Sequence, residues 1–251
     1  VLNLWLLFSG CMKTELSLNN LYPDSSIIVK YQDDYQRSTF LKRISDFKKD
    51  PIGKNKVVFL GNSITNGLRR YSSEFDRSDI VNRGIDGDFS LAMLQRINEI
   101  IYYKPKAVFI LIGINDFFTD LTMIPEVTPE FVSKNILKAA ETIKNGSPKT
   151  MVYLHTILPI NAQQYQDKLM KDTGYGYNWL EPNFEININE QVIETNKILR
   201  KNITFPVVDL HPLFIENNNV MNKMYSTDGI HLNKRGYLKW INKILPILNT
   251  H

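Results

Sequence analysis

Residues 57–67 read VVFLGNSITNG, and this stretch decides how the rest of the chain is interpreted. Its four leading apolar residues have the length and composition of a buried strand, and the residues after them can open a helix. Ser63 therefore lies at a strand-to-helix turn, where unpaired backbone N–H groups favour developing negative charge. Its hydroxyl is a candidate nucleophile if other parts of the chain can activate it.

Apolar runs of strand length recur along the chain, at residues 80–82, 107–112, 151–157 and 207–210. Between and after them, apolar residues recur at helical spacing, in stripes that begin at Leu91, Val132, Ile188 and Tyr237. Near-continuous apolar strands that alternate with amphipathic helices predict a parallel sheet buried on both faces. The expected fold class is α/β, a three-layer α/β/α sandwich with a five-stranded parallel sheet.

The composition narrows the classes of partner and cofactor. The 251 residues carry a formal net charge of +4, and the 30 lysines and arginines are scattered. Because no basic run could follow a phosphate backbone, nucleic acid is not an expected partner. The single cysteine, Cys11, allows neither an intrachain disulfide nor a cysteine-based metal cluster.

The segment before Cys11 is an apolar run that ends in small residues, VLNLWLLFSG. It resembles the end of a bacterial lipoprotein signal, whose cysteine is lipidated after cleavage. This predicts a signal remnant at residues 1–11, membrane contact only through a lipid at Cys11, and a location in the cell envelope (periplasmic or outer-membrane associated) or outside the cell. The alternative is an apolar segment that packs on the core.

Polar residues follow the first three predicted strands and precede the last predicted helix. Ser63, Gly84 and Asn115 follow the strands, while Asp228 and His231 precede the helix. Because the carboxyl ends of parallel strands meet at one edge of a sheet, we expect these residues to lie together. A serine hydroxyl is a weak nucleophile until an imidazole takes its proton and a carboxylate orients that imidazole.

Ser63, His231 and Asp228 can fill these three roles. A separation of three residues lets Asp228 reach Nδ1 of His231 and leaves Nε2 for Ser63. The tetrahedral intermediate of acyl transfer also needs hydrogen-bond donors for its oxyanion. The candidates are the backbone N–H groups of Ser63 and Gly84 and the side-chain amide of Asn115, and Gly84 is suited because no side chain obstructs its approach.

These blocks resemble those of the SGNH (GDSL-type) hydrolase family, which is named for a serine, a glycine, an asparagine and a histidine. They correspond here to Ser63, Gly84, Asn115 and His231, and Asp228 falls at the aspartate of the family's D-x-x-H motif. The resemblance covers residues 54–251. It implies a flavodoxin-like fold, a Ser-His-Asp mechanism, an oxyanion hole from Ser63, Gly84 and Asn115, and neither a metal nor an organic cofactor.

The first block has one unusual residue. Asn62 stands where the commoner form of the block has aspartate, which changes the local hydrogen bonding but leaves the triad complete. The GNSIT variant is similar to carbohydrate and sialate O-acetylesterases and to platelet-activating-factor-acetylhydrolase-like proteins. The resemblance favours an esterase that removes O-acetyl groups from a small-molecule or glycan ester. The alternatives are a lysophospholipase or thioesterase of the same fold and a catalytically silent glycan-binding lipoprotein.

The remaining segments complete the expected organisation. Residues 12–50 are predicted to form a tether and an amphipathic scaffold helix that buries Phe40, Ile44 and Phe47, and residues 51–251 a hydrolase catalytic domain. Residues 161–187 interrupt the alternation with an aromatic and glycine-containing loop, a candidate substrate wall or lid. A packed surface insertion is the alternative.

Three other residues compete for the roles of base and acid. His155 lies inside a predicted strand and is expected to be a core histidine. His211 precedes a proline after the fifth strand, so a structural role in that turn is expected. Asp209 ends that strand but lacks the short spacing to the histidine of the last block, which favours Asp228.

Overall fold

The computed structural model describes residues 16–118, 124–174, 184–216 and 219–251, which form an α/β fold. Five parallel strands make one sheet in the order β2-β1-β3-β4-β5. The strands are β1 (Val57–Gly61), β2 (Ile80–Gly84), β3 (Ala107–Leu111), β4 (Met151–His155) and β5 (Val207–Val208). The predicted parallel five-stranded sheet is confirmed. The predicted signal remnant at residues 1–11 lies outside the described residues.

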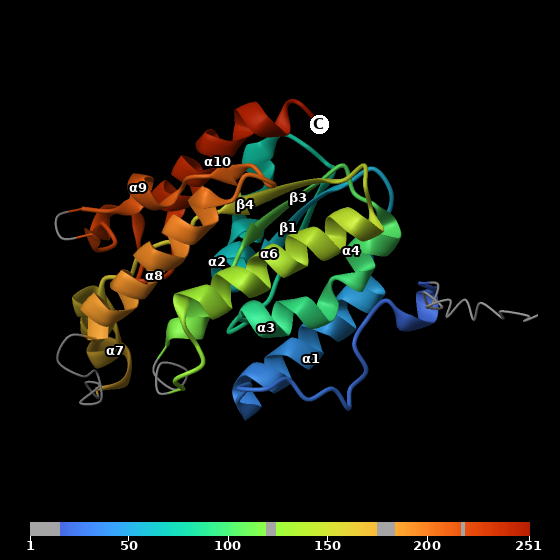
Figure 1. Ribbon diagram of the computed structural model, residues 1–251. Coiled ribbons are helices and arrows are strands. Elements are labelled where there is room, and N and C mark those ends of the chain that lie inside the picture. The colour runs from blue at the N-terminus through green and yellow to red at the C-terminus, as the bar shows by residue number, and fades with distance from the viewer. Residues whose placement is uncertain (1–15, 119–123, 175–183, 217–218) are drawn as a thin grey trace, which may run out of the picture.

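Helices cover both faces of the sheet (Figure 1). The longer ones are α1 (Asp34–Lys49), α6 (Pro129–Gly146), α7 (Ala162–Thr173), α8 (Phe184–Lys201) and α10 (Lys234–Leu248). The shorter ones are η1 (Leu18–Asn20), α2 (Ser63–Gly67), η2 (Leu68–Phe75), α3 (Ser90–Met93), η3 (Leu94–Arg96), α4 (Asn98–Tyr103), η4 (Ile114–Phe117), α9 (His211–Phe214) and η6 (Lys223–Tyr225). No described helix combines the length and the apolar composition needed to cross a bilayer.

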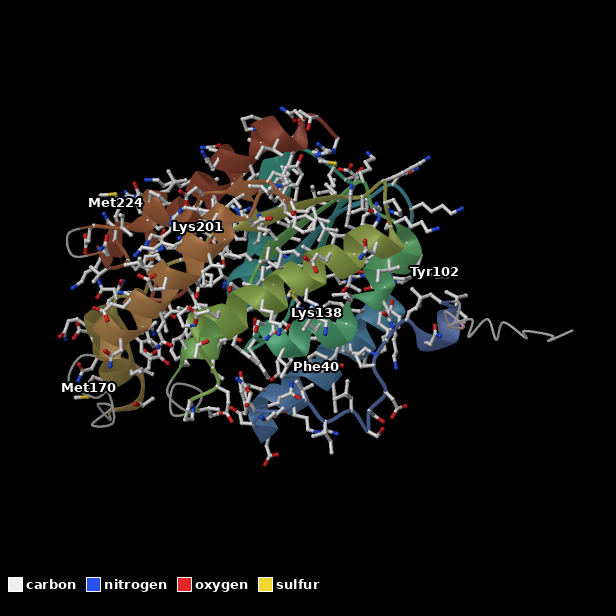
Figure 2. The ribbon with its side chains drawn as sticks, viewed as in Figure 1. Phe40, Tyr102, Lys138, Met170, Lys201 and Met224 are labelled. Atoms are coloured by element: carbon white, nitrogen blue, oxygen red, sulfur yellow. The ribbon has the colours of Figure 1, made fainter. Side chains whose placement is uncertain are left out.

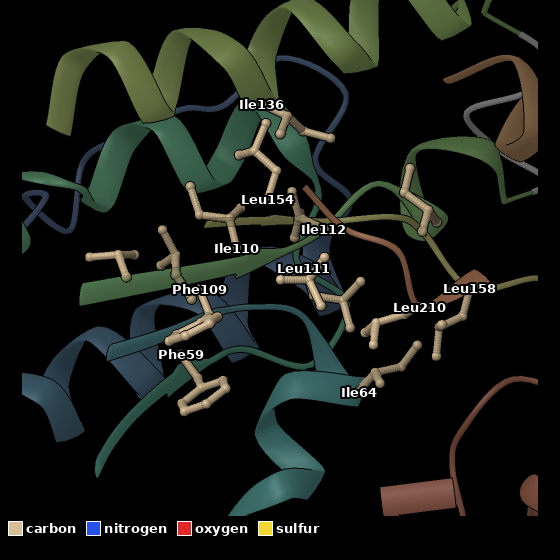
Figure 3. Close-up of a cluster of buried hydrophobic side chains, with 14 of the residues drawn as sticks. Phe59, Ile64, Phe109, Ile110, Leu111, Ile112, Ile136, Leu154, Leu158 and Leu210 are labelled. Atoms are coloured by element: carbon tan, nitrogen blue, oxygen red, sulfur yellow. The ribbon is translucent and has the colours of Figure 1, made fainter. Parts of the chain in front are cut away.

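The core has two halves, one on each side of the sheet. Every residue of β1 and of β3 is buried. Ile110 and Leu154 lie on the side of Ile136 from α6, and Phe59 lies on the opposite side (Figure 3). There the ring of Phe59 packs edge-on against Trp240 of α10, with centroids 6.2 Å apart. Polar residues such as Lys138 remain on the outer surface (Figure 2).

The register of the sheet decides which loops meet. Gly61, the last residue of β1, pairs with Gly84 of β2 on one side and with Leu111 of β3 on the other. The three loops that follow these strands therefore leave the sheet side by side. This edge carries the polar residues that the sequence singled out.

The amphipathic helix predicted near the N-terminus is α1. Asp33 caps it, since its carboxylate accepts a hydrogen bond from the N–H of Gln36 at 2.6 Å. Phe40, Ile44 and Phe47 are buried as predicted. They form a second apolar cluster with Val29, Ile85, Phe89 and Ala92, which docks α1 beside the loop that follows β2.

One predicted helix is broken in the structure. The stripe of Leu91, Leu94, Ile97 and Ile101 predicts one continuous helix, but the chain forms α3, tightens into η3 and continues as α4. A 3₁₀ turn has three residues instead of 3.6, so it shifts the phase of the buried side. Of the predicted stripe only Ile97 is fully buried, and Ala92, Met93 and Ile100 take the other core positions.

The loop predicted at residues 161–187 is helical at both ends. Residues 162–173 form α7, and α8 begins at Phe184. No residue of α7 is buried, so it has no apolar stripe for the sequence to reveal. Local contacts define it instead, because Asn161 caps its first turn through the N–H of Gln164. Residues 175–183 lie outside the described part.

Candidate active site

Ser63 is the first residue of α2, and only Asn62 separates it from the end of β1. The side chain of Asn62 is buried, and its Oδ1 accepts a hydrogen bond from the N–H of Ile64 at 3.0 Å. Asn62 therefore serves as the N-cap of α2, a role that needs only an acceptor oxygen. Gly61 is required before it, because a Cβ there would collide with the carbonyl oxygen of Leu111.

Ser63, His231 and Asp228 form a hydrogen-bonded chain, although the first two are 168 residues apart. Oγ of Ser63 lies 2.9 Å from Nε2 of His231, and Nδ1 of His231 lies 2.7 Å from Oδ2 of Asp228. The other carboxylate oxygen accepts the N–H groups of Ile230 at 3.0 Å and of His231 at 2.7 Å. Burial would raise the pKa of Asp228, but the contacts with His231 outweigh it and hold the pKa below its ordinary value.

The turn that carries Asp228 and His231 is rigidly built. Oγ of Ser226 accepts the N–H of Gly229 at 2.7 Å and donates to the carbonyl oxygen of His231 at 2.9 Å. Gly229 has φ of +89°, and a Cβ there would collide with the carbonyl oxygen of Asn161. The close contact with the start of α7 is thus possible only for glycine.

The structure corrects the expectation that Gly84 donates to an oxyanion. Its N–H is already donated to Oδ1 of Asn82 at 2.9 Å. A Cβ at Gly84 would collide with the backbone of Asn66 and Asn62, so this glycine allows α2 to pack closely on β2. Gly84 supports the position of the Ser63 turn without offering a free donor.

Gly87 is the glycine that the sequence reasoning missed. It lines the same cavity as Ser63 and Asn115, and it has φ of +75°. Among the described residues, no acceptor takes the N–H of Gly87 or that of Ser63. Asn115 donates one amide hydrogen to the carbonyl oxygen of Asp88 at 2.8 Å and retains a second. The signal in the sequence was a second glycine three positions after Gly84, beyond the end of the strand.

A buried ion pair fixes these loops. Nη2 of Arg96 lies 2.6 Å from Oδ2 of Asp88, and both side chains are almost fully buried. The same guanidinium donates to the carbonyl oxygens of Arg83 at 2.8 Å and of Gly61 at 2.9 Å. Because Asp88 directly follows Gly87, Arg96 connects the ends of β1 and β2 to the loop that carries the N–H of Gly87.

A second buried carboxylate, Asp116, lies behind Asn115. It accepts the hydroxyl of Ser90 at 2.6 Å and the N–H of Ser90 at 3.0 Å, and Asn135 donates to that hydroxyl at 3.0 Å. Burial raises the pKa of Asp116 to about 7, against the hydrogen bonds from Ser90. Asp116 connects the loop after β3 to the start of α3.

The triad opens into a cavity of about 1100 Å³, called here the Ser63 cavity. Its walls come from the N-terminal segment with α1, from α2 with η2, from the loops after β2 and β3, from α7, and from the turn before α10. These walls are lined by Tyr31, Asp33, Tyr35, Gln36, Ser63, Asn66, Gly67, Arg69, Arg70, Asp86, Gly87, Asn115, Phe118, Tyr165, Thr227, Asp228, Ile230 and His231. The helix expected only as a scaffold thus forms part of a wall, and so does the described half of the 161–187 stretch.

The competing residues lie elsewhere. His155 is buried, accepts the indole N–H of Trp240 at 3.3 Å, and burial lowers its pKa to about 3. His211 is buried and has Nδ1 2.9 Å from the carbonyl oxygen of Ile157. Oδ1 of Asp209 lies 2.8 Å from Nη2 of Arg200, with which it forms an ion pair. In the part of the chain that the structure describes, no group of three or more His, Cys, Asp or Glu residues could hold a metal ion.

Known proteins share this sequence pattern and this architecture. The family model described as GDSL-like Lipase/Acylhydrolase matches residues 59–239, a range that includes Ser63 and His231. One curated relative, an N-acylneuraminate cytidylyltransferase of Escherichia coli, is 24% identical over 173 residues, which are 68% of this chain and 35% of the relative. The chain therefore spans about a third of the length of that relative.

Solved structures resemble the whole fold. A GDSL-like lipase from Bacteroides thetaiotaomicron superposes with a TM-score of 0.65 at 21% identity, covering 85% of this chain and 98% of the other. A lipase/acylhydrolase from Enterococcus faecalis gives 0.55 at 20% identity, with 78% and 96% covered. A catalytic mutant of an acetylxylan esterase from Geobacillus stearothermophilus gives 0.56 at 19% identity, with 77% and 94% covered.

Proposed function

Because this chain belongs to the GDSL-like lipase/acylhydrolase family, we propose that it is a serine esterase that removes small acyl groups, chiefly O-acetyl groups, from carbohydrate. Family and fold support an ester hydrolase. The observation that carries the proposal is the hydrogen-bonded chain from Ser63 through His231 to Asp228, with steps of 2.9 and 2.7 Å. That arrangement supplies a nucleophile, a base and a group that orients the base.

The reaction follows from this geometry. Oγ of Ser63 attacks the ester carbonyl while Nε2 of His231 takes its proton, and Asp228 stabilises the imidazolium. The negative oxygen of the tetrahedral intermediate is bound by the N–H groups of Ser63 and Gly87 and by the amide of Asn115. His231 then gives the proton to the leaving alcohol, and the ester between the acyl group and Ser63 remains. Water, deprotonated by His231, hydrolyses that ester.

The lining of the Ser63 cavity favours a short acyl group on a polar alcohol. Among the described residues that line it, only Phe118 and Ile230 have purely hydrocarbon side chains. A long acyl chain would need an extended apolar lining, because its binding depends on burying hydrocarbon surface. The names of two similar proteins, an acetylxylan esterase and an N-acylneuraminate enzyme, support a sugar ester, while the lipases among the similar structures correspond to the lipid-directed alternative.

The test combines a substrate series with a variant. Nitrophenyl esters from acetate to octanoate, and a panel of O-acetylated glycans with acetate release as the readout, should show the fastest turnover for acetyl esters. Ser63→Ala should lower kcat by roughly 10⁴-fold or more, because it removes the nucleophile. Ser73→Ala, at an exposed serine of η2, is the matched control and should leave turnover unchanged.

Two results would contradict the proposal. Faster turnover of octanoate than of acetate would favour the lipid-directed alternative. Activity that survives Ser63→Ala would rule out a mechanism in which Ser63 is the nucleophile. A wild-type protein that hydrolyses none of these esters but binds a glycan would instead support the catalytically silent glycan-binding lipoprotein.

A further inference from the structure

Two arginines line the Ser63 cavity at adjacent positions, Arg69 and Arg70. Arg70 follows Ser63 by seven residues, with Asn66 and Gly67 between them at the third and fourth positions. Residues at these spacings share one side of a helix, and α2 continues directly into η2. The Cα atoms of Ser63 and Arg70 are separated by roughly 10–14 Å along the segment. The guanidinium of Arg70 turns back toward Gly67, because its Nη2 would lie 3.2 Å from a Cβ at that glycine.

Both guanidinium groups are anchored by neutral partners. Nε of Arg69 donates to the carbonyl oxygen of Asn66 at 3.3 Å. The guanidinium of Arg70 lies beside the hydroxyl of Tyr237, which is itself buried and donates to the carbonyl oxygen of Ile64 at 2.9 Å. In the described part of the chain, neither arginine has a carboxylate oxygen within 4.0 Å. Both side chains are exposed, and each keeps N–H donors that no described acceptor takes.

Each described carboxylate of the cavity already accepts hydrogen bonds from the protein. Asp33 caps α1 and Asp228 holds His231. Asp86, the acid of the cavity that acts electrostatically on Arg69, accepts the side-chain amide of Asn66 at 2.7 Å. All three acidic side chains of the cavity thus have donors within the protein.

Arg43 and its partner Asp46 act on Arg69 with opposite charges. Burial, followed by the like charge of Arg43, lowers the pKa of Arg69, although the guanidinium remains charged. Arg43 is itself paired with Asp46 at 3.1 Å. An anion entering beside Arg69 and Arg70 would find N–H donors that no described carboxylate contacts within 4.0 Å.

We propose that Arg69 and Arg70 bind an anionic group, a carboxylate or a phosphate, on the alcohol part of the ester. The inference rests on the proposed function and narrows its substrates to acidic esters. The planar, forked guanidinium matches the oxygens of these anions. Because an acetyl group carries no negative charge, the anion belongs to the leaving alcohol and not to the acyl group.

Matched substrate pairs test this inference. Acetylated glucuronic acid is compared with acetylated glucuronamide, and acetylglycerol 3-phosphate with acetylglycerol, so that each pair differs in the anion. The wild type should show kcat/KM roughly tenfold or more higher for the acid of at least one pair, and added salt should reduce that preference. The pair that shows the preference identifies the anion as carboxylate or phosphate.

Variants connect the preference to the arginines. The double variant Arg69→Gln/Arg70→Gln should bring the ratio of kcat/KM for acid over neutral ester close to one, mainly through KM for the acid. Lys138→Gln removes one positive charge from the exposed surface of α6 and should leave the ratio unchanged. Equal kcat/KM for acid and neutral esters in the wild type, or a preference that survives in the double variant, would overturn the inference.

A binding measurement separates this inference from the proposed function. Calorimetric titration of Ser63→Ala with both members of each pair should show tighter binding of the acid, and the triple variant with Arg69→Gln/Arg70→Gln should lose that difference. If the wild type hydrolyses no ester but this difference is found, the proposed function fails and the anion site stands. If Ser63→Ala binds acid and neutral compounds equally, the anion site fails whatever the activity.

Discussion

The side chain of Asn115 has one amide hydrogen committed to the carbonyl oxygen of Asp88 and one available for the oxyanion. Removing such a donor typically costs on the order of 3 kcal/mol of transition-state stabilisation. Asn115→Ala should therefore lower kcat by roughly 10²- to 10³-fold and change KM little, because the oxyanion exists only during the reaction. Steady-state kinetics on an acetyl ester, with exposed Asn249→Ala as control, measures this. A change confined to KM would remove Asn115 from the oxyanion hole.

Asp116 makes stability depend on pH. Its folded pKa is about 7, raised by burial, while the unfolded pKa is about 3.9. At pH values between these two pKa values, Asp116 is protonated in the folded protein and ionised in the unfolded chain. The contribution is therefore favourable at low pH and is lost as pH rises through about 7.

The corresponding prediction compares the wild type with Asp116→Asn, a neutral side chain of the same shape. From about pH 5 to about pH 8, the free energy of unfolding of the wild type should fall by roughly 2 to 3 kcal/mol relative to the variant. Urea unfolding at several pH values gives this difference. A difference that is constant with pH, or that grows in favour of the wild type as pH rises, would contradict the raised pKa.

Between elements, the pair of Arg96 and Asp88 joins η3 to the ends of β1 and β2. Arg96→Met should lower the free energy of unfolding by roughly 3–5 kcal/mol, because it leaves Asp88 charged, buried and uncompensated. It should also lower kcat, since the Asp88 carbonyl positions Asn115. Asp88→Asn combined with Arg96→Met should recover part of the stability in urea unfolding. If the single variant unfolds at the wild-type urea concentration, the pair is not what fixes these loops.

The helical elements show where sequence patterns succeed and fail. The stripes of α6, α8 and α10 were predicted correctly, and their positions, such as Ile136, Val192 and Ile241, are buried. α7 was missed because it buries no side chain, and α3 and α4 were fused into one helix because the 3₁₀ turn between them has no sequence signature. Periodicity reports burial, so it predicts an element only where the element packs evenly on a core.

For the whole molecule, α1 serves both stability and the site. Ile44 is 2% exposed and packs in the second apolar cluster, while Tyr35 and Gln36 of the same helix line the Ser63 cavity. Ile44→Ala should cost roughly 2–4 kcal/mol of stability and raise KM for glycan esters, because α1 is held less firmly. Thermal unfolding and steady-state kinetics measure both effects. Ile203→Ala is the control, since Ile203 is 99% exposed and should change neither.

An unchanged KM in Ile44→Ala, together with the lost stability, would mean that α1 is only a scaffold, as its sequence suggested. We expect KM to change, because hydrogen bonds join the N-terminal segment to the rest of the protein. Tyr22 donates to Glu99 at 2.8 Å, and Glu99 is paired with Arg83 of β2 at 2.9 Å.

The proposed lipid at Cys11, which precedes this segment, stays a prediction from the sequence.

The sequence by itself determined the five strands, the parallel sheet and the candidate triad of Ser63, Asp228 and His231. These follow from local patterns, since a strand of apolar residues and a D-x-x-H turn are each encoded within a few positions. The tertiary structure alone decided that α1 forms a cavity wall. It also decided that, among the described residues, the N–H of Gly87 and not that of Gly84 is free, and that Arg69 and Arg70 have no carboxylate oxygen within 4.0 Å. Such facts depend on contacts between distant segments, which the linear spacing of residues does not contain.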